Sequence, residues 1–445
     1  MTCDAAPPLH LRSGGVRVSG IQSAKLVRWY LHAAMLFNIP ATESQVDSLG
    51  GRYVVYTVFL DGILLCKVRY SEMHRWNEEL SRMFKSCLPR FPPKVYLVMT
   101  QKQADDRRLG LEQYLQGVAR ISSVVVSEVF CKFLQKMQQE LLSNHKLDGV
   151  CEVLLPDGRS IAVHTKASDT SQTILEAVFD QIGLPLDLRG YFNLFIVKGK
   201  GKEDFCILKK LVPWELPRYT LEAGKTEHWA LMVRKSYSDL TLDSMVLQKS
   251  SGLHLLCAQA RGDMERGWSL PTAAQCQELE GLLQAERMKE FLHAAQLVEH
   301  YGCMQMDICT CDCPEPDLPA VVRVGQQSIT CCLMLPLNNL QQICYHISRV
   351  KSWRVSMLSP SDEEDFMFEL SFEYKCDSNT KWITVHSKQA FFLSTCMDQL
   401  WMEWQQGHAD RSNNVRFSEA VLRWPSIEVE GTMGKVFEGI TEDAL

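Results

Sequence analysis

Residues 52–94 decide the fold of the first unit, and they read RYVVYTVFLDGILLCKVRYSEMHRWNEELSRMFKSCLPRFPPK. In this stretch Tyr53–Phe59 alternates as a half-buried strand does, Asp61-Gly62 is typical of a hairpin turn, and Ile63–Val68 predicts a second strand. Ser71–Phe84 is expected to be a helix with its first residue as the N-cap, because apolar side chains recur at helical spacing. The order predicts a small sheet with a helix beside it.

A proline-rich loop follows this helix. Leu88–Lys94 contains two adjacent prolines, which exclude both a helix and a strand ladder, so we expect an extended segment. Two helical patterns come next, at Ala104–Val118 and Ser127–Leu142. The first domain is therefore placed at residues 37–143.

Three further units are expected after the first. The second unit has the order strand, tight turn, strand, helix and further strands, which is the β-β-α-β-β order of ubiquitin. The third is helical throughout, and the fourth combines short strands with one amphipathic helix, Lys388–Gln405. The expected boundaries are 1–36 for a disordered leader, 149–236 for the second unit, 240–313 for the third, 318–406 for the fourth and 407–445 for a flexible tail.

Composition bounds the class of protein. A chain of 445 residues, 46% of them hydrophobic, is long and apolar enough for two to four packed domains. The net charge of −6 makes generic nucleic-acid binding a poor hypothesis. The longest stretch without charges, Gly325–Ser348, is interrupted by Gln, Asn and Pro336, so no transmembrane helix is expected.

The 17 cysteines are scattered and odd in number, which favours a reducing compartment over a disulfide framework. One cluster is dense enough to suggest a metal: Cys303, Cys309, Cys311 and Cys313. Its C-x-C-x-C spacing is not that of a zinc knuckle, and no second pair follows at zinc-site spacing. We expect buried thiols and no metal ligand here.

Catalytic motifs are missing from the sequence. It has no Cys-x5-Arg phosphatase loop, phosphate-binding P-loop, G-x-S-x-G or H-E-x-x-H. Gly199–Lys202 lacks the Ser or Thr and the upstream glycine of a phosphate-binding loop, and it is expected to be a solvated hairpin tip. The chain is therefore expected to be a non-enzyme without a cofactor.

Basic side chains at separated points of the first unit could converge on one anion. Arg69 with Tyr70 ends a strand, Lys94 leaves the proline-rich loop, and Arg107 with Arg108 begins a helix. A phosphorylated ring needs a bidentate guanidinium, an aromatic or aliphatic floor and a second cation. The alternative is that each of them is an ordinary surface charge.

This pattern resembles the phox-homology (PX) domain of the sorting nexins, which binds phosphatidylinositol 3-phosphate. The resemblance implies one role for each matching residue. Arg69 would clamp the 3-phosphate, Tyr70 would pack against the inositol ring, Ser71 would support the phosphate, Lys94 would meet the bridging phosphate, and Arg107 would hold the ring hydroxyls, with Arg108 as the alternative for that last role.

The resemblance extends from Phe37 to Gln405 and covers the sorting nexins that carry a FERM-like module. It rests on short segments: Gly190-Tyr191-Phe192, Glu265-Arg266-Gly267-Trp268, His300-Tyr301-Gly302 and Thr310-Cys311-Asp312. The implied fold is a multidomain α+β chain, with a PX domain of three strands plus helices, a ubiquitin-like F1 lobe, a helical F2 lobe and an F3 lobe like a phosphotyrosine-binding (PTB) domain. No PDZ domain precedes the PX-like unit, which favours the members that lack one.

In this family the last lobe takes NPxY or NPxF tails of membrane receptors, by adding an extended peptide to a sheet edge beside a helix. The residues expected there are Trp353, Val355, Met397 and Trp401, with both tryptophans partly exposed. The alternative for most of the helical stripe is that it is simply core.

The C-terminal residues Phe437, Ile440 and Leu445 are expected to form a motif that binds the retriever complex, as similar termini in the family imply; a solubilising acidic end is the alternative. An inserted Ala444 shifts the acidic residues relative to Leu445. The implied function is a cytoplasmic adaptor, peripheral on early endosomes, that promotes recycling to the cell surface. The competing hypothesis is a FERM-type scaffold that binds small GTPases.

Overall fold

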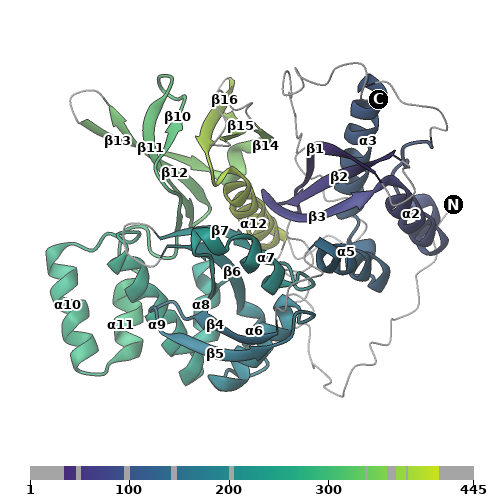
Figure 1. Cartoon of the computed structure of the whole chain (residues 1–445). Helices are drawn as coiled ribbons and strands as arrows, with labels where there is room; N and C mark the ends of the chain where they lie inside the picture. The colour runs from purple at the N-terminus through teal and green to yellow at the C-terminus, as the bar shows by residue number, and fades with distance from the viewer. Residues whose placement is uncertain are drawn as a thin grey trace.

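The structure is a computed structural model of the chain, and Figure 1 shows its four units. The first unit is drawn in purple and blue, the helical third unit lies at the opposite side of the molecule, and helix α12 lies between the strand-rich fourth unit and the rest. The residues that the structure describes are 35–46, 52–94, 101–141, 148–199, 205–335, 339–357, 367–376 and 379–409. Residues 1–34 and 410–445 lie outside them.

The first unit is an antiparallel sheet in the order β1-β2-β3 with helices packed against it. The predicted strands, hairpin turn and three main helices are confirmed, whereas β1 was not predicted. Its alternation is interrupted at Pro40, where the register shifts between Asn38 and Ala41. The elements are β1 (Phe37–Val46), β2 (Arg52–Leu60), β3 (Ile63–Arg69), α2 (Tyr70–Phe84), α3 (Gln101–Ala119), α4 (Ser122–Val125) and α5 (Glu128–Leu141).

The N-cap of helix α2 lies two residues earlier than predicted. Its N-cap is Arg69, whose backbone N–H donates to Glu72 Oε2 at 2.9 Å, so Ser71 lies inside the first turn. The prediction of Ser71 as the N-cap was wrong. The backbone N–H of the cap residue can instead be satisfied by a glutamate three residues further on, as Glu72 does for Arg69. This shift places Arg69 and Tyr70 at the junction of strand and helix.

The leader was also predicted too long. Met35 and Leu36 are buried, and Leu36 exchanges two hydrogen bonds with Asp61, from Leu36 N to Asp61 Oδ1 and from Asp61 N to Leu36 O, both at 2.9 Å. At the other end, α12 (Ala390–Ala409) continues past Gly407, where the flexible tail was expected to begin. Glycine lowers helix stability by only about 1 kcal/mol, which the flanking helix tolerates.

The second unit has the predicted ubiquitin-like order. Its sheet runs β5-β4-β8-β6-β7, with β4 and β8 parallel and the other neighbours antiparallel. Helix α6 is capped by Thr170, whose Oγ1 accepts from Thr173 N, and it buries its apolar face on the sheet. The elements are β4 (Gly149–Leu154), β5 (Ser160–Thr165), α6 (Ser171–Gln181), β6 (Phe192–Lys198), β7 (Cys206–Lys210), α7 (Pro217–Ala223) and β8 (Ala230–Lys235).

The third unit is helical, and the fourth is a strand-rich lobe closed by one helix. The third contains α8 (Asp243–Val246), α9 (Ser250–Glu265), α10 (Ala273–Gln284) and α11 (Met288–Ala295). In the fourth, the sheet order is β13-β12-β11-β10-β16-β15-β14, with β9 (Met304–Gln305) paired to β11. Its strands are β10 (Cys309–Cys311), β11 (Leu318–Gly325), β12 (Ser328–Leu335), β13 (Asn339–His346), β14 (Val350–Met357), β15 (Phe368–Lys375) and β16 (Thr380–Ser387).

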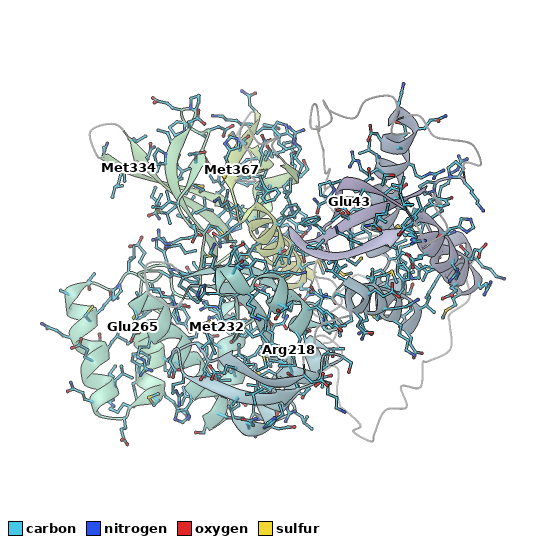
Figure 2. All side chains as sticks on the ribbon, in the orientation of Figure 1. Glu43, Arg218, Met232, Glu265, Met334 and Met367 are labelled. Atoms are coloured by element: carbon cyan, nitrogen blue, oxygen red, sulfur yellow. The ribbon has the colours of Figure 1, made fainter. Side chains whose placement is uncertain are left out.

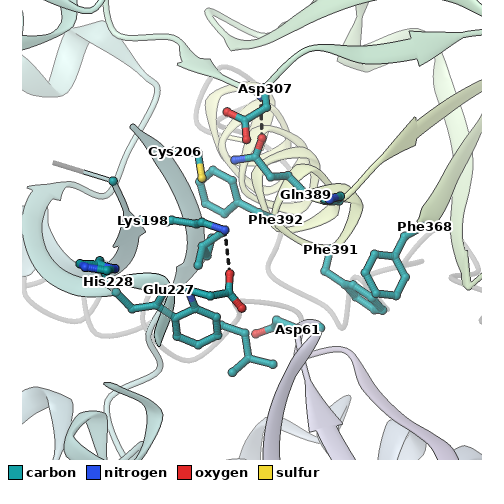
Figure 3. A pocket seen from close by; sticks show the side chains of 16 residues that line it. Asp61, Lys198, Cys206, Glu227, His228, Asp307, Phe368, Gln389, Phe391 and Phe392 are labelled. Atoms are coloured by element: carbon teal, nitrogen blue, oxygen red, sulfur yellow. Dashed lines mark hydrogen bonds and ion pairs between the residues drawn. The ribbon is translucent and has the colours of Figure 1, made fainter. Parts of the chain in front are cut away.

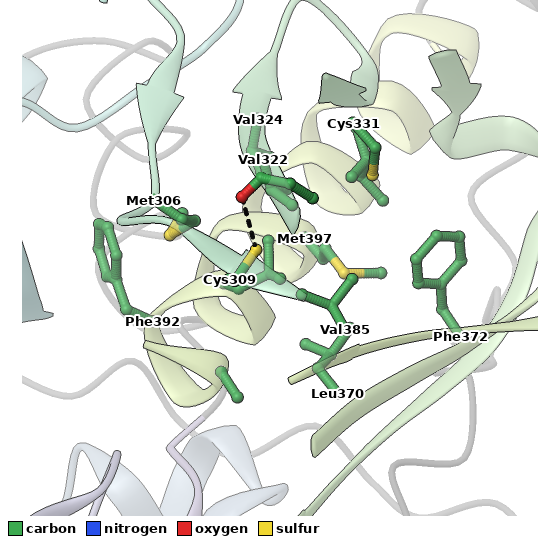
Figure 4. Close-up of a cluster of buried hydrophobic side chains, with 14 of the residues drawn as sticks. Met306, Cys309, Val322, Val324, Cys331, Leu370, Phe372, Val385, Phe392 and Met397 are labelled. Carbon is green, nitrogen blue, oxygen red and sulfur yellow. Dashed lines mark hydrogen bonds between the residues drawn. The ribbon is translucent and has the colours of Figure 1, made fainter. Parts of the chain in front are cut away.

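The interior of the fourth unit is continuous with part of the second. Figure 4 shows Phe392 and Met397 of α12 among strand residues such as Val322 and Val385. Met232 of β8 belongs to the same buried cluster, whereas Met334 lies at the outer margin of the molecule (Figure 2). Within the described residues, every helix is too short or too polar to cross a membrane.

The β2–β3 hairpin tip of the first unit docks onto the second and fourth. It borders a pocket of about 850 Å³ that also contains Lys198, Glu227 and Phe391 (Figure 3). Lys198 Nζ donates to Glu227 Oε2 at 2.7 Å on one wall, and Phe391 of α12 faces the hairpin tip. Three units therefore meet at a single turn.

Gly62 in this turn should tolerate no side chain. Its φ is +78°, and a Cβ there would lie 2.7 Å from Cδ2 of the buried Phe391. We expect Gly62→Ala to lower the free energy of unfolding by about 1–3 kcal/mol more than Gly158→Ala does. Gly158 is the matched control because its φ is +85° with no atom within 4 Å of the added Cβ. Equal losses in thermal or urea denaturation would show that the docking contact contributes little.

Candidate functional site

The end of β3, the proline-rich loop and the start of α3 form one candidate site around Tyr70. The hydroxyl of Tyr70 donates to the carbonyl oxygen of Pro92 at 2.9 Å, which holds the loop against α2. The guanidinium carbon of Arg107 lies 4.5 Å from the centre of the Tyr70 ring. The Phe91 ring lies 5.6 Å from the same ring and packs edge-on against Tyr114. The structure thus brings together residues that lie up to 44 positions apart in the sequence, from Tyr70 to Tyr114.

Arg69 lies exposed at the same junction. Its guanidinium carbon is 3.3 Å from the centre of the Tyr53 ring, so a cation–π contact with β2 orients the side chain. An aromatic partner leaves the charge of an arginine uncompensated, unlike a carboxylate partner. This arrangement keeps the Arg69 guanidinium suited to an anion.

Arg107 is the most informative residue of the site. Its Nε and Nη2 atoms are buried, and neither makes a hydrogen bond of good geometry among the described residues. The Tyr56 hydroxyl lies beside this guanidinium; burial raises the pKa of that hydroxyl, and the positive charge of Arg107 and a hydrogen-bonding interaction with it oppose the rise. Since buried donors are costly to leave unpaired, the Arg107 guanidinium is suited to a ligand that accepts hydrogen bonds.

Arg108, the alternative to Arg107, has a structural role. It is buried, its Nη1 donates to the carbonyl oxygen of Ile39 at 2.6 Å, and it lies 4.0 Å from Glu112 Oε2. Glu112 in turn accepts from the backbone N–H of Ile39 at 2.6 Å. The pair therefore fixes β1 onto α3 and is not available to a ligand.

Ser71 and Lys94 are both exposed near this centre. Ser71 lies in the first turn of α2, where backbone N–H groups and the helix dipole favour an anion. Lys94 is the last described residue of the proline-rich loop. Together with Arg69, Tyr70 and Arg107, the arrangement can bind a phosphorylated ring, with cations for the phosphates and an aromatic surface for the ring.

A second candidate site lies at the edge strand β14 beside α12. Among the described strands, β14 pairs only with β15, so its other edge can accept an added strand. Trp353, however, is fully buried, and its Nε1 donates to Ser394 Oγ of α12 at 3.0 Å. The prediction of a partly exposed Trp353 was wrong, because the strand turns this side chain inward and a helix hydroxyl satisfies its only donor.

Val355 and Met397 are also fully buried, so neither can touch a bound peptide directly. With Trp353 they belong to the buried cluster that packs β14 against α12. Trp401 is partly buried, as expected, and its ring lies 5.3 Å from that of Trp404. Of the four residues predicted to bind cargo, only Trp401 has a partly exposed side chain.

Arg354 and Trp382 were not predicted. They lie on the outer face of the β14–β16 strands, with the guanidinium carbon 5.0 Å from the indole ring. Trp382 is 44% exposed, the largest exposed aromatic surface of this lobe among the described residues. Strict alternation from Trp353 would have indicated that Arg354 faces outward.

Two predicted features remain, the C-terminal motif and the cysteine cluster, and the structure describes only the second. Phe437, Ile440 and Leu445 lie outside the described residues. In the cysteine cluster, burial raises the pKa of Cys303 and of Cys309 to about 12, whereas a hydrogen bond with Cys331 lowers the pKa of Cys311. Within the described ranges no three His, Cys, Asp or Glu side chains are grouped to hold a metal.

Comparison with protein-family models gives three matches. Residues 57–137 match the PX domain, residues 149–238 the F1 lobe of the sorting nexin 17/27/31 FERM domain, and residues 302–405 the sorting nexin 17 FERM C-terminal domain. These descriptions name no catalytic domain.

Curated relatives match most of the chain. Sorting nexin-31 of Mus musculus is 43% identical over 82% of this chain and 85% of its own length. Sorting nexin-17 of Homo sapiens is 36% identical over 82% of this chain and 81% of its own length. A mutant MyTH4-FERM MF2 domain of Dictyostelium discoideum myosin VII aligns with 68% of this chain and 73% of that chain, at 9% identity and a TM-score of 0.39.

Replacing Trp353 should first lower the stability of the lobe, and any loss of peptide binding should follow from that. Trp353→Ala removes a fully buried indole and leaves Ser394 without its partner. We therefore expect the free energy of unfolding to fall by about 3–5 kcal/mol. Trp382→Ala is the control, because Trp382 is the partly exposed tryptophan of the same lobe. Chemical denaturation should separate the two variants; similar stabilities would place Trp353 at the surface.

Proposed function

Because the chain belongs to the sorting nexins that join a PX domain to a FERM module, we propose that it is an endosomal sorting adaptor. It binds phosphatidylinositol 3-phosphate through the PX domain and NPxY or NPxF receptor tails through the F3 lobe, and it promotes their return to the cell surface. The observation that carries this proposal is the Arg107 guanidinium over the Tyr70 ring, whose buried Nε and Nη2 make no hydrogen bond of good geometry among the described residues.

The family assignment agrees with the expectation drawn from the sequence. Segments such as His300-Tyr301-Gly302 predict similarity to sorting nexin 31, with sorting nexin 17 as a near relative, and the identities of 43% and 36% confirm it. The multidomain α+β fold is confirmed as well, with a three-stranded PX sheet followed by a FERM-type module.

The lipid role is supported by the chemistry around Tyr70. A phosphoinositide headgroup offers phosphate oxygens to Arg69 and Arg107 and a ring to stack beside Tyr70. Ser71 and Lys94 border the same place as further donors. Each basic residue near a membrane contributes only about 1 kcal/mol, so lipid binding alone holds the protein weakly.

The cargo role is supported by the β14 edge. An NPxY-type peptide can extend the sheet there and place its aromatic side chain near α12, where Trp401 is partly exposed. Trp353, Val355 and Met397 support this groove from inside the lobe. When lipid and cargo are bound to the same membrane, the second contact forms at a high effective concentration. The combined binding is therefore stronger than either contact alone.

The C-terminal residues Phe437, Ile440 and Leu445 complete the proposal as a docking motif for the retriever complex. Apolar residues among acids at a chain end can fold onto a partner surface. This contact would join the loaded adaptor to the recycling machinery.

The lipid site is tested by Arg107→Met in the full chain. Loss of a charge-assisted contact worth about 1.5–3 kcal/mol should weaken pelleting with vesicles that contain phosphatidylinositol 3-phosphate by at least about tenfold. Arg75→Met is the control, because Arg75 is an exposed cation on the same domain but outside the Tyr70 cluster. Equal pelleting of wild type with plain phosphatidylcholine vesicles would contradict the proposal.

The cargo site is tested by Trp401→Ala. We expect this change to remove most of the affinity for an NPxY-type peptide in calorimetry, with an unchanged circular dichroism spectrum and unchanged lipid binding. Trp382→Ala on the outer sheet face should bind the peptide as wild type does. The opposite ranking of the two variants would move the peptide to the outer face of the sheet.

A further inference from the structure

The F3 sheet has a second open edge, which the proposed cargo site does not use. At the end opposite β14, strand β13 pairs with β12 in an unbroken register from Ser328–His346 to Leu335–Asn339. Among the described strands, β13 has no neighbour on its other side. Figure 1 shows this hairpin at the margin of the molecule away from the PX domain.

Most of β13 is exposed, and its outer part is uncharged, with one exposed apolar side chain among polar amides. Leu340 is 74% exposed, and Met334, its cross-strand partner on β12, is 50% exposed. Figure 2 shows Met334 on the projecting hairpin. Gln341, Gln342 and Cys344 are exposed further along the strand. Only the C-terminal end is anchored, where the Tyr345 ring packs 5.1 Å from that of Tyr374.

This edge has none of the usual protection. Gly325–Ser348, which includes both strands of the hairpin, contains no Asp, Glu, Lys or Arg, and β13 has eight residues without a proline. Natural sheets normally shield an edge of this length with charges, prolines or bulges, because bare edges pair with other chains. The β14 edge, in contrast, carries Lys351 and Arg354.

We infer that β13 pairs antiparallel with β13 of a second copy of this chain, joining two F3 sheets across a two-fold axis. In an isologous antiparallel contact, residue i of one copy meets residue j of the other, and residues near the axis meet their own copies; an uncharged strand such as β13 can therefore meet itself in any register without like-charge repulsion. The chain as a whole has a net charge of −6, so other faces of two copies repel each other on average.

Other occupants fit the edge less well. A strongly charged peptide would find no complementary charge in 325–348, and an anionic membrane would find no Lys or Arg there. A second copy satisfies the open backbone groups of both strands and packs beside Leu340 on both sides of the axis. The dimer would also carry two lipid sites and two cargo sites, a consequence that rests on the proposed function.

The test is a charge swap at Gln342, an exposed residue in the middle of β13. Wild-type chain should dimerise in sedimentation velocity at micromolar concentration. Gln342→Lys and Gln342→Glu should each weaken the dimer by at least about tenfold, because like charges then face each other near the axis. An equimolar mixture of the two variants should recover a dimer, since opposite charges now meet.

Gln327→Lys is the matched control, because it adds the same charge to an exposed turn before the same hairpin. This variant should dimerise as wild type does. A monomeric wild type up to about 100 μM, well above a micromolar dissociation constant, would overturn the inference. So would a dimer that both Gln342 variants leave intact, or a mixture that stays monomeric. Vesicle pelleting of the Gln342 variants should be unchanged at saturating lipid, which separates this result from a failure of the lipid site.

Discussion

The buried ammonium of Lys209 ties the PX domain to the FERM module, and the arrangement of both candidate sites depends on it. Lys209 is only 2% exposed; its Nζ donates to Glu215 Oε2 at 2.6 Å and to the carbonyl oxygen of Leu60 at 3.2 Å, and it lies 3.7 Å from Asp61 Oδ2. Burying a charge is costly unless its partners are complete, and these come from two domains. Separating the domains would remove the oxygen atoms of Leu60 and Asp61 from around the buried ammonium. The PX domain and F1 are therefore expected to behave as one body.

The same junction reaches the F3 lobe through the β2–β3 turn. Burial raises the pKa of Asp61 to about 6, and the positive charge of Lys209 opposes that rise. Asp61 also fixes Leu36 at the entry to β1, and its neighbour Gly62 packs under Phe391 at the start of α12. Helix α12 then runs past Ser394, which holds Trp353 and the β14 edge. One chain of contacts thus links the turn of the PX-domain sheet to the β14 edge, where peptide binding is proposed.

The two ends of the F3 sheet differ in chemistry, which separates their roles. The β14 edge combines charged side chains with a helix beside it, an arrangement suited to a receptor tail of defined sequence. The β13 edge is uncharged and projects without a helix, an arrangement suited to an identical edge. A sheet open at both ends can therefore bind cargo and a second copy at once. Lipid, cargo and partner copy would each add a weak contact to a common assembly.

The sequence by itself determined most of the elements and their order, but not β1, whose alternation is interrupted at Pro40. The Asp61-Gly62 turn, the proline loop at Leu88–Lys94 and the apolar periodicities are local signals, and local backbone sterics suffice to read them. Family motifs added the domain identities. Only the tertiary structure decided between Arg107 and Arg108 and turned Trp353 inward. Periodicity states which residues share a face, but which face is buried depends on distant partners, such as Ile39 for Arg108 and Ser394 for Trp353.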